Sequence, residues 1–361
     1  MKKLTVCLIA LLCAATALAQ PQPNDDGTVT FRYRNDSASH VKVNVQFAGT
    51  HDMQRAADGT WTVTLGPAAP DLYPYCYIVD GLSVMDPENP QYFPNEGFKN
   101  SLLEIPAKSG NLPHDIRNVQ HGRLEYIHYY SRSLGGTNQA VVYLPPRYME
   151  NQQKRYPVFY LISGTTDTEE VYYKVGRVNY ILDNLLDAGQ AREMIVVMPY
   201  GNMNTGNPRP SSPEATKCYE IFSQEMKECI MPYVEKNFRT KTERENRAIA
   251  GFSRGGGEAL YTAFRLSDQF ASVCAYSANE TLFQQKGIRF EQFDTTGGHT
   301  WMNARKFLGL TAPKLFKVQS KVVEEGGAGA YKAVVESEET LPGFTIYRPQ
   351  DMSAAVKAEG K

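Results

Sequence analysis

The sequence predicts two folded parts, an antiparallel β-sandwich followed by a mostly parallel sheet with helices on both faces. Three observations support this prediction. The chain has 361 residues, which favours two domains over one. Residues 28–107 show apolar residues in strict alternation between turns. After residue 121, short apolar runs alternate with amphipathic stretches of helical period.

The first predicted domain spans residues 28–107. Apolar side chains occupy every second position in four stretches, and Asp58-Gly59 and Asp80-Gly81 supply turns; the stretches are 29–33, 41–47, 61–65 and 73–79. Side chains on a strand alternate between its two faces, so this pattern predicts strands with one buried face. Short strands with such turns are typical of a small antiparallel sandwich.

Three aromatic residues of this region have two interpretations. Trp61, Tyr73 and Tyr75 would form a stacking platform for sugar rings if their side chains faced solvent. A sandwich core needs large apolar residues at the same alternating positions, and we favour core packing for that reason.

A linker is expected at residues 108–120, and the second domain at residues 121–319. Apolar runs at 140–143, 158–162, 194–198 and 247–250 predict strands of a buried sheet, because the central strands of a parallel sheet are covered on both faces. Helical spacing at 180–186, 222–238 and 256–266 predicts the intervening helices.

Ser253 is the strongest candidate for a catalytic residue. It lies in Gly251-Phe252-Ser253-Arg254-Gly255, a G-x-S-x-G pentapeptide between a predicted strand and a predicted helix. That context indicates a nucleophile elbow, a sharp turn that exposes a serine hydroxyl at the carboxyl edge of a sheet. Small residues flank the serine because the backbone bends tightly there.

Several motifs resemble a known family. They are Val142-Tyr143-Leu144-Pro145-Pro146-Arg147-Tyr148, Tyr156-Pro157-Val158-Phe159-Tyr160-Leu161, Met231-Pro232-Tyr233-Val234-Glu235, Arg247-Ala248-Ile249-Ala250-Gly251-Phe252-Ser253 and Gly297-Gly298-His299-Thr300-Trp301. With them, residues 121–317 resemble the esterase-D type feruloyl and acetyl-xylan esterases, which are α/β-hydrolases. This resemblance implies hydrolysis of esters on plant cell-wall polysaccharide, mainly xylan, by an acyl-enzyme route without a cofactor.

The first domain carries a resemblance of its own. Tyr77-x-Val79-Asp80-Gly81 and Asp86-Pro87-x-Asn89-Pro90 are similar to motifs of the immunoglobulin-like E-set modules, which are related to glycogen-binding modules and often precede such esterases. The resemblance implies a carbohydrate-binding-like module at residues 28–107.

His299 is the candidate base. A serine hydroxyl needs a positioned base to take its proton, and histidine is the usual one. His299 follows Gly297-Gly298 after a predicted strand at 289–293, and it matches the C-terminal histidine of the family motif.

The carboxylate that would orient His299 is not identified by the motif. The resemblance implies one more strand–helix unit between Ser253 and His299, with an aspartate at the strand end, but the two residues are too close in sequence to accommodate it. Glu280, which follows the strand after the elbow, and Asp294 are the substitutes; we favour Glu280 and interpret Asp294 as a solvated loop residue. A triad without its acid loses on the order of 10⁴-fold in rate.

Two backbone N–H groups would form the oxyanion hole. The first belongs to Arg254, whose side chain we expect to be solvated, and the second to Thr165 in Ser163-Gly164-Thr165-Thr166, where the family has a His-Gly-Gly-like turn. Trp301 would line the substrate site or fill the core. The carboxylates of Asp167, Glu169 and Glu170 in the same loop are expected to form a solvated acidic rim.

The amino terminus predicts export. Lys2 and Lys3 precede an apolar run at residues 4–18, and Ala17-Leu18-Ala19 resembles a cleavage site, so residues 1–19 are expected to be a signal peptide and the mature protein secreted or periplasmic. Lys and Arg number 38 against 39 Asp and Glu, which leaves no basic field for nucleic acid. No further run approaches the length of a membrane span, and no metal-ligand cluster is evident.

Residues 320–361 differ again in composition and resemble the opening of a further domain, which we expect to be poorly ordered and not to take part in catalysis. Three functions stay open from the sequence. They are a secreted serine esterase acting on xylan, a catalytically impaired homologue that binds carbohydrate or acts as a scaffold, and, more weakly supported, a peptidase or acyltransferase.

Overall fold

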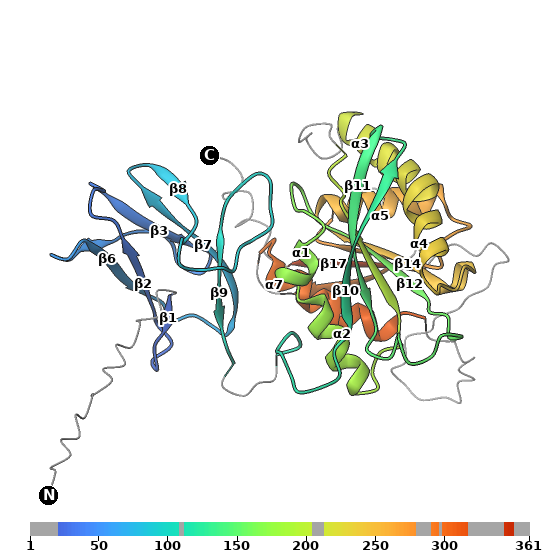
Figure 1. Ribbon diagram of the computed structural model, residues 1–361, viewed down its shortest axis with the longest axis horizontal. Coiled ribbons are helices and arrows are strands. Elements are labelled where there is room, and N and C mark those ends of the chain that lie inside the picture. Colours follow the sequence, from blue (N-terminus) through green and yellow to red (C-terminus); the bar gives the residue numbers. More distant parts are fainter. Residues whose placement is uncertain are drawn as a thin grey trace, which may run out of the picture. The chain divides into compact units, whose positions relative to one another are not determined.

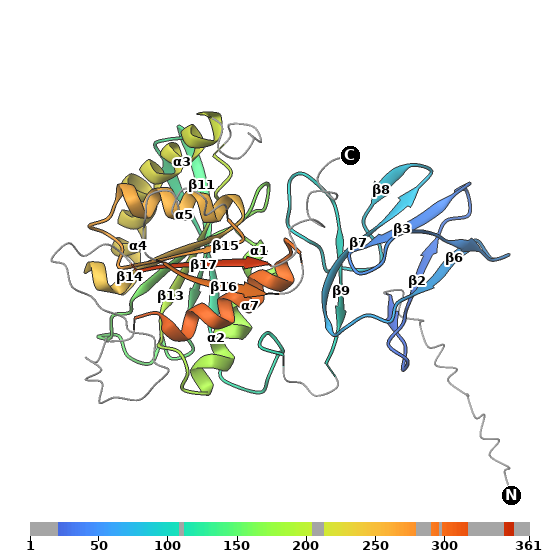
Figure 2. The ribbon, with the colours of Figure 1, turned by 180° about the vertical axis from the view of Figure 1, so that it is seen from behind.

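A computed structural model describes residues 21–107, 112–203, 213–278, 290–295, 298–316 and 343–349 (Figures 1 and 2). The chain divides into two compact units. The first comprises Met1–Phe93 and Lys99–Pro106, and the second comprises Pro94–Phe98 and Ala107–Lys361. The predicted signal peptide at residues 1–19 lies outside the described residues.

The first unit is built from two antiparallel sheets. One has the strand order β1-β2-β6-β5 and the other β4-β3-β7-β8, with β9 also pairing β7. The strands are β1 (Gln22–Pro23), β2 (Val29–Arg34), β3 (Val41–Val45), β4 (Gly49–Asp52), β5 (Gln54–Arg55), β6 (Thr60–Leu65), β7 (Asp71–Val79), β8 (Leu82–Val84) and β9 (Ser101–Ile105). The alternating sequence thus forms antiparallel strands, as predicted.

The aromatic residues of the first unit fill its core. Trp61, Tyr73 and Tyr75 are all at most 5% exposed. The ring of Tyr75 packs edge-on against Phe31 with centroids 5.6 Å apart, and its hydroxyl donates to Asp86 Oδ2 at 2.7 Å. Since none of the three rings faces solvent, they form no exposed stacking platform, and the core interpretation holds.

The second unit is an eight-stranded sheet that is mostly parallel, with the strand order β10-β11-β13-β12-β14-β15-β17-β16. Its strands are β10 (Arg123–Ser131), β11 (Gly136–Leu144), β12 (Val158–Ile162), β13 (Ile195–Pro199), β14 (Arg247–Phe252), β15 (Ser272–Tyr276), β16 (Phe290–Thr295) and β17 (Gly343–Pro349). Strands β12, β13 and β14 are buried along their whole length, as expected for central strands covered on both faces.

Helices cover both faces of this sheet. They are α1 (Val171–Lys174), α2 (Val178–Asp187), α3 (Pro213–Glu225), the π-helical turn η1 (Met226–Ile230), α4 (Met231–Asn237), the short η2 (Arg244–Asn246), α5 (Arg254–Arg265), α7 (Trp301–Thr311) and η3 (Ala312–Lys314). In both views α3, α4 and α5 lie on one side of the sheet, with α2 and α7 on the other (Figures 1 and 2). This is the predicted arrangement of an α/β-hydrolase.

Strand β17 departs from the sequence-based expectation. We expected residues 320–361 to be poorly ordered and to open a further domain, but residues 343–349 form a strand between β15 and β16 and run parallel to both. Cys274 pairs with Thr345 on one side, and Gln292 pairs with Ile346 on the other. The backbone groups of a strand need partners, and a place between two parallel neighbours supplies them on both edges. The expectation is therefore corrected for these seven residues.

Two further observations concern the described residues only. Within them, no helix has the length and apolar composition that a membrane crossing requires. The described part of the chain also holds no group of three or more His, Cys, Asp or Glu side chains arranged to bind a metal ion.

Candidate active site

Ser253 occupies the turn between β14 and α5. Its backbone has φ 56° and ψ −121°, in a region that L-residues rarely adopt. Such a conformation costs on the order of 1–3 kcal/mol and persists only where the surrounding structure imposes it. The Ser253 N–H donates to the carbonyl oxygen of Tyr276 at 2.8 Å, which ties the turn to the carboxyl end of β15. The strand, turn and helix thus form the sharp elbow that the G-x-S-x-G motif predicts.

Close backbone contacts explain the glycines around Ser253. A Cβ on Gly251 would lie 2.1 Å from the carbonyl oxygen of Gly255, on the opposite side of the elbow. A Cβ on Gly255 would lie 2.2 Å from the carbonyl oxygen of Ser163 and 2.4 Å from that of Ile162. The first turn of α5 therefore abuts the carboxyl end of β12, which brings the nucleophile turn next to the loop that begins at Ser163.

His299 lies beside the nucleophile turn. Its imidazole ring stacks on the ring of Phe252, the residue before Ser253, with centroids 4.8 Å apart and an interplanar angle of 28°. Helix α7 begins two residues later, at Trp301. Ser253 and His299 are 46 positions apart in the chain. The contact between His299 and Phe252 thus brings His299 close to the turn that holds Ser253.

The two candidate acids stay predictions. Glu280, the favoured one, lies outside the described residues. Asp294 is exposed near the end of β16, where it pairs in register with Arg348 of β17.

Thr165 is held in a tight loop after β12. The Asp167 N–H donates to the Gly164 carbonyl at 3.3 Å, so this carbonyl points into the loop. A trans peptide directs its C=O and N–H to opposite sides, and the Thr165 N–H of the same peptide therefore points out of the loop. The Thr165 N–H is thus not taken up by the Asp167–Gly164 bond of the loop, and the role of Thr165 as an oxyanion donor stays a prediction.

Asp167 corrects the interpretation of this loop as a solvated rim. Its side chain is only 4% exposed and accepts hydrogen bonds from the Asn95 amide at 2.7 Å and the Gly164 N–H at 3.2 Å. Burial raises the pKa of Asp167 to about 7, against the opposing effect of these bonds and of one from the Trp301 side chain.

The neighbouring carboxylates are engaged as well. Glu169 is 5% exposed, and its Oε1 accepts a hydrogen bond from Gln139 at 2.7 Å. Glu170 accepts from the Tyr173 hydroxyl at 2.9 Å and pairs with Lys174 at 3.0 Å. The expected solvated rim is therefore wrong, because packing against β11 and α1 gives each carboxylate a partner within the protein.

Trp301 is a packed residue. It is 8% exposed, and its ring lies 4.8 Å from that of Tyr172 and 5.1 Å from that of Phe252. It therefore supports the ring on which His299 stacks. Its predicted contact with substrate stays a prediction.

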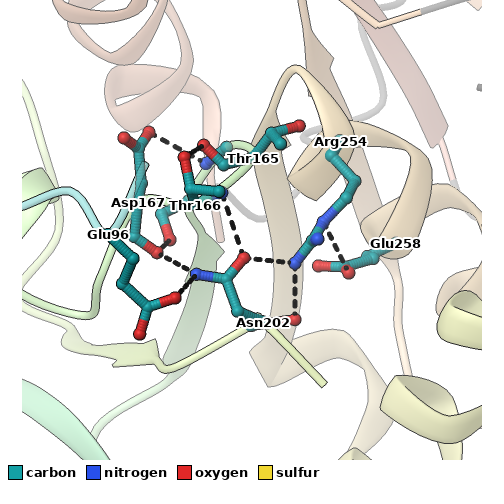
Figure 3. A network of polar contacts seen from close by, with 10 residues as sticks. Glu96, Thr165, Thr166, Asp167, Asn202, Arg254 and Glu258 are labelled. Carbon is teal, nitrogen blue, oxygen red and sulfur yellow. Dashed lines mark hydrogen bonds and ion pairs between the residues drawn. The ribbon is translucent and has the colours of Figure 1, made fainter. Parts of the chain in front are cut away.

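The Arg254 side chain is only 10% exposed and is hydrogen-bonded, in contrast to the solvated side chain expected from the sequence (Figure 3). Its Nη2 donates to the Gly201 carbonyl at 2.9 Å and to Asn202 Oδ1 at 2.6 Å. Its Nε lies 3.3 Å from Oε1 of Glu258, one turn along α5. Glu258 is 0% exposed, and burial raises its pKa to about 8 although the Arg254 guanidinium opposes this shift. A largely buried cation is thus held in place next to Ser253.

Sequence reasoning missed Asn202 and Glu258. Asn202 follows β13 by three residues, at the same edge of the sheet as Ser253, and the rule that functional residues follow the carboxyl ends of parallel strands would have identified it. Glu258 carries no comparable signal, because a glutamate four residues after an arginine is ordinarily a surface pair on a helix.

The sheet order and the turn at Ser253 define an α/β-hydrolase fold. Comparison with known proteins gives the family. Residues 131–317, more than half of the chain, match the family model described as "Putative esterase". The chain belongs to this esterase family.

The chain matches only part of the length of its known relatives. The chain is 32% identical over 256 residues to an endo-1,4-beta-xylanase/feruloyl esterase of Xylanibacter ruminicola, a match that covers 69% of this chain and 35% of that protein. It is 30% identical over 173 residues to an esterase of Mycobacterium tuberculosis, with 48% of this chain and 36% of that protein covered. The chain thus spans about a third of the length of these relatives.

Solved structures with the same fold include an enterochelin esterase and a ferric enterobactin esterase. The enterochelin esterase of Shigella flexneri aligns with a TM-score of 0.57 at 16% identity, over 95% of this chain and 93% of that one. The ferric enterobactin esterase of Salmonella typhimurium aligns with a TM-score of 0.54 at 14% identity, over 95% and 94% of the two chains. At these identities the likeness concerns the fold.

Proposed function

We propose that this protein is a serine carboxylesterase that removes feruloyl or acetyl groups from plant cell-wall polysaccharide. The conformation of Ser253, a serine held at positive φ between β14 and α5, is the observation that carries the proposal. In the proposed reaction, Ser253 Oγ attacks the ester carbonyl and His299 takes its proton. The Arg254 and Thr165 N–H groups stabilise the oxyanion of the tetrahedral intermediate. His299 then gives the proton to the alcohol oxygen as the ester C–O bond breaks, which leaves the acyl-enzyme. Water, deprotonated by His299, hydrolyses the acyl-enzyme and releases the acid and free Ser253.

The substrate class rests on similarity. The relative from Xylanibacter ruminicola carries the name endo-1,4-beta-xylanase/feruloyl esterase, and its match covers 69% of this chain. The chemistry of the proposed site needs no cofactor, because the serine, the base and the backbone donors supply the nucleophile, the proton transfer and the charge stabilisation. A cleavable signal at residues 1–19 would place the protein in the periplasm or outside the cell, where such polysaccharides occur.

The direct test compares wild-type protein with Ser253→Ala on methyl ferulate, p-nitrophenyl acetate and acetylated or feruloylated xylo-oligosaccharides. We expect wild-type turnover of at least one ester and a loss of about 10⁴-fold or more in the variant. A fluorophosphonate probe should add its mass to the wild-type protein alone. Equal, background-level rates for both proteins would reject hydrolysis.

A catalytically impaired homologue is the alternative. The short chain between Ser253 and His299 supports it, because it leaves no room for the strand–helix unit whose aspartate the family resemblance implies. Serine labelling without ester turnover, together with retention on insoluble xylan, would favour this alternative. Glu280→Gln and Asp294→Asn separate the candidate acids: the variant that lowers kcat by several orders of magnitude identifies the residue that orients His299.

A further inference from the structure

Asn202 lies at the centre of a polar network that includes Arg254, the residue after Ser253 (Figure 3). It is 9% exposed, and its side-chain amide makes four contacts. Oδ1 accepts from the Thr166 N–H at 3.1 Å and from Arg254 Nη2 at 2.6 Å. Nδ2 donates to the Asp167 carbonyl at 3.0 Å and to Glu96 Oε2 at 3.3 Å.

These partners fix the orientation of the amide. Both groups on the Oδ1 side are donors, and both groups on the Nδ2 side are acceptors. A reversed amide would oppose donor to donor and acceptor to acceptor at every contact. All hydrogen-bonding groups of a nearly buried side chain are thus matched, which makes it a rigid link between the segments it touches.

Two of these segments carry the predicted oxyanion donors. Thr166 and Asp167, both bound by Asn202, directly follow Thr165. Arg254, bound through its guanidinium, is the residue whose N–H is the other donor. A single amide therefore connects the two sides of the predicted oxyanion hole.

The loop conformation depends on this connection. Thr166 has φ 58°, a left-handed conformation that is unfavourable for a β-branched residue. Its N–H is bound by Asn202, and its hydroxyl donates to Asn95 Oδ1 at 2.9 Å or to its neighbour's carbonyl, the Thr165 oxygen, at 2.7 Å. Without the bond to Asn202, one of the contacts that hold Thr166 in this conformation is lost, and the adjacent Thr165 peptide is freer to rotate.

We propose that Asn202 is a positioning residue that holds the Thr165 and Arg254 N–H groups at the spacing an oxyanion requires. This inference rests on the proposed esterase function and adds to it a residue that acts through its hydrogen bonds to the two donor segments. Donors fixed in advance stabilise the developing negative charge without reorganising, and the effect is therefore expected in kcat rather than in KM.

The test compares Asn202→Ala with Asn184→Ala. Asn184 is a matched control, because its buried amide also links backbone segments, donating to the Pro113 and Asp115 carbonyls at 3.0 and 2.9 Å. We expect Asn202→Ala to lower kcat on p-nitrophenyl acetate by about 10- to 100-fold, less than the loss of a whole donor, with KM changed by less than about threefold. Asn184→Ala should lower the melting temperature and leave kcat unchanged.

A second variant guards against misfolding. Arg254→Met keeps the backbone N–H but removes the guanidinium that Asn202 binds, and it should lower kcat in the same direction. In the double variant, kcat should fall much less than the product of the two single-variant losses, because both substitutions break the same Asn202–Arg254 hydrogen bond. An active wild-type protein whose Asn202→Ala variant keeps full kcat would overturn the inference alone. A wild-type protein that neither hydrolyses esters nor reacts with a fluorophosphonate would overturn the proposed function and the inference with it.

Discussion

Gly255 gives the sharpest test of how α5 positions the nucleophile. An alanine Cβ at this position would lie 2.2 Å from the Ser163 carbonyl oxygen and 2.4 Å from that of Ile162. Ordinary carbon–oxygen contacts are about 3.5 Å, so the start of α5 and the end of β12 would have to separate by roughly 1 Å. Both neighbours are backbone atoms of a buried strand end, which cannot rotate away as a side chain does.

The expected magnitude follows from two opposing contributions. Overpacking of this kind costs about 1–3 kcal/mol, while replacing a helical glycine by alanine gains up to about 1 kcal/mol. Gly255→Ala should therefore destabilise the second unit by about 1–2 kcal/mol, and a shift near 1 Å at the elbow should lower kcat/KM by about 100-fold. Urea unfolding and ester hydrolysis measure the two effects.

Gly309 in α7 is the matched control. A Cβ there would meet only Pro113 Cβ, at 4.0 Å, so Gly309→Ala should be neutral or stabilising by up to about 1 kcal/mol, with unchanged turnover. If Gly255→Ala retained wild-type stability and rate, the close contact between α5 and β12 would not govern the elbow, and this reasoning would be refuted.

Three further predictions concern Ser253, Glu258 and β17. Ser253→Gly should raise the free energy of unfolding by about 1 kcal/mol relative to Ser253→Ala, because glycine adopts φ 56° without strain. Urea titrations of both variants measure this difference, and equal stabilities would contradict it. Because the folded-state pKa of Glu258, about 8, exceeds its ordinary value of 4.5, the native protein keeps a proton that the unfolded chain releases between these values, so stability should fall as pH rises through this window. Glu258→Gln should remove up to about 1.4 kcal/mol per pH unit from that slope, as measured by unfolding at pH 5, 6.5 and 8, and an unchanged slope would exclude Glu258 as its source. Removing residues 320–361 should lower the melting temperature of the protein, because β15 and β16 lose the strand they share; an unchanged melting temperature would show that β17 contributes nothing to the sheet.

The elbow could be predicted from the sequence because its determinants are local. A strand, a serine between glycines and a helix follow one another within residues 247–265, and the steric demands of the turn explain each small residue. The core of the first unit was predictable for a similar reason, since alternation places Tyr73 and Tyr75 on one face of β7.

The polar surroundings of Ser253 could not be predicted, because their partners come from distant segments. Arg254 was expected to be solvated, yet it binds Asn202, 52 residues away. Asp167 was expected on a rim, yet it is bonded to Asn95, 72 residues away. A charged residue in an isolated sequence looks solvated by default, and only the fold shows which charges acquire buried partners.

Strand β17 occupies the sheet next to β15, where the missing strand–helix unit with its aspartate would follow in the chain. The 46 positions from Ser253 to His299 are too few for the additional strand and helix that the family resemblance implies. The sheet order agrees, because β15 and β16 follow one another along the chain but are not neighbours in the sheet. The place between them is occupied by residues that follow His299 by more than forty positions. The sheet is thus continuous at this place, and the short stretch between Ser253 and His299 does not by itself argue against the proposed roles of these two residues. The missing strand–helix unit is the one whose strand end would carry the acid in the family resemblance. Its absence is therefore expected to lower the rate of ester hydrolysis and to leave the fold unchanged.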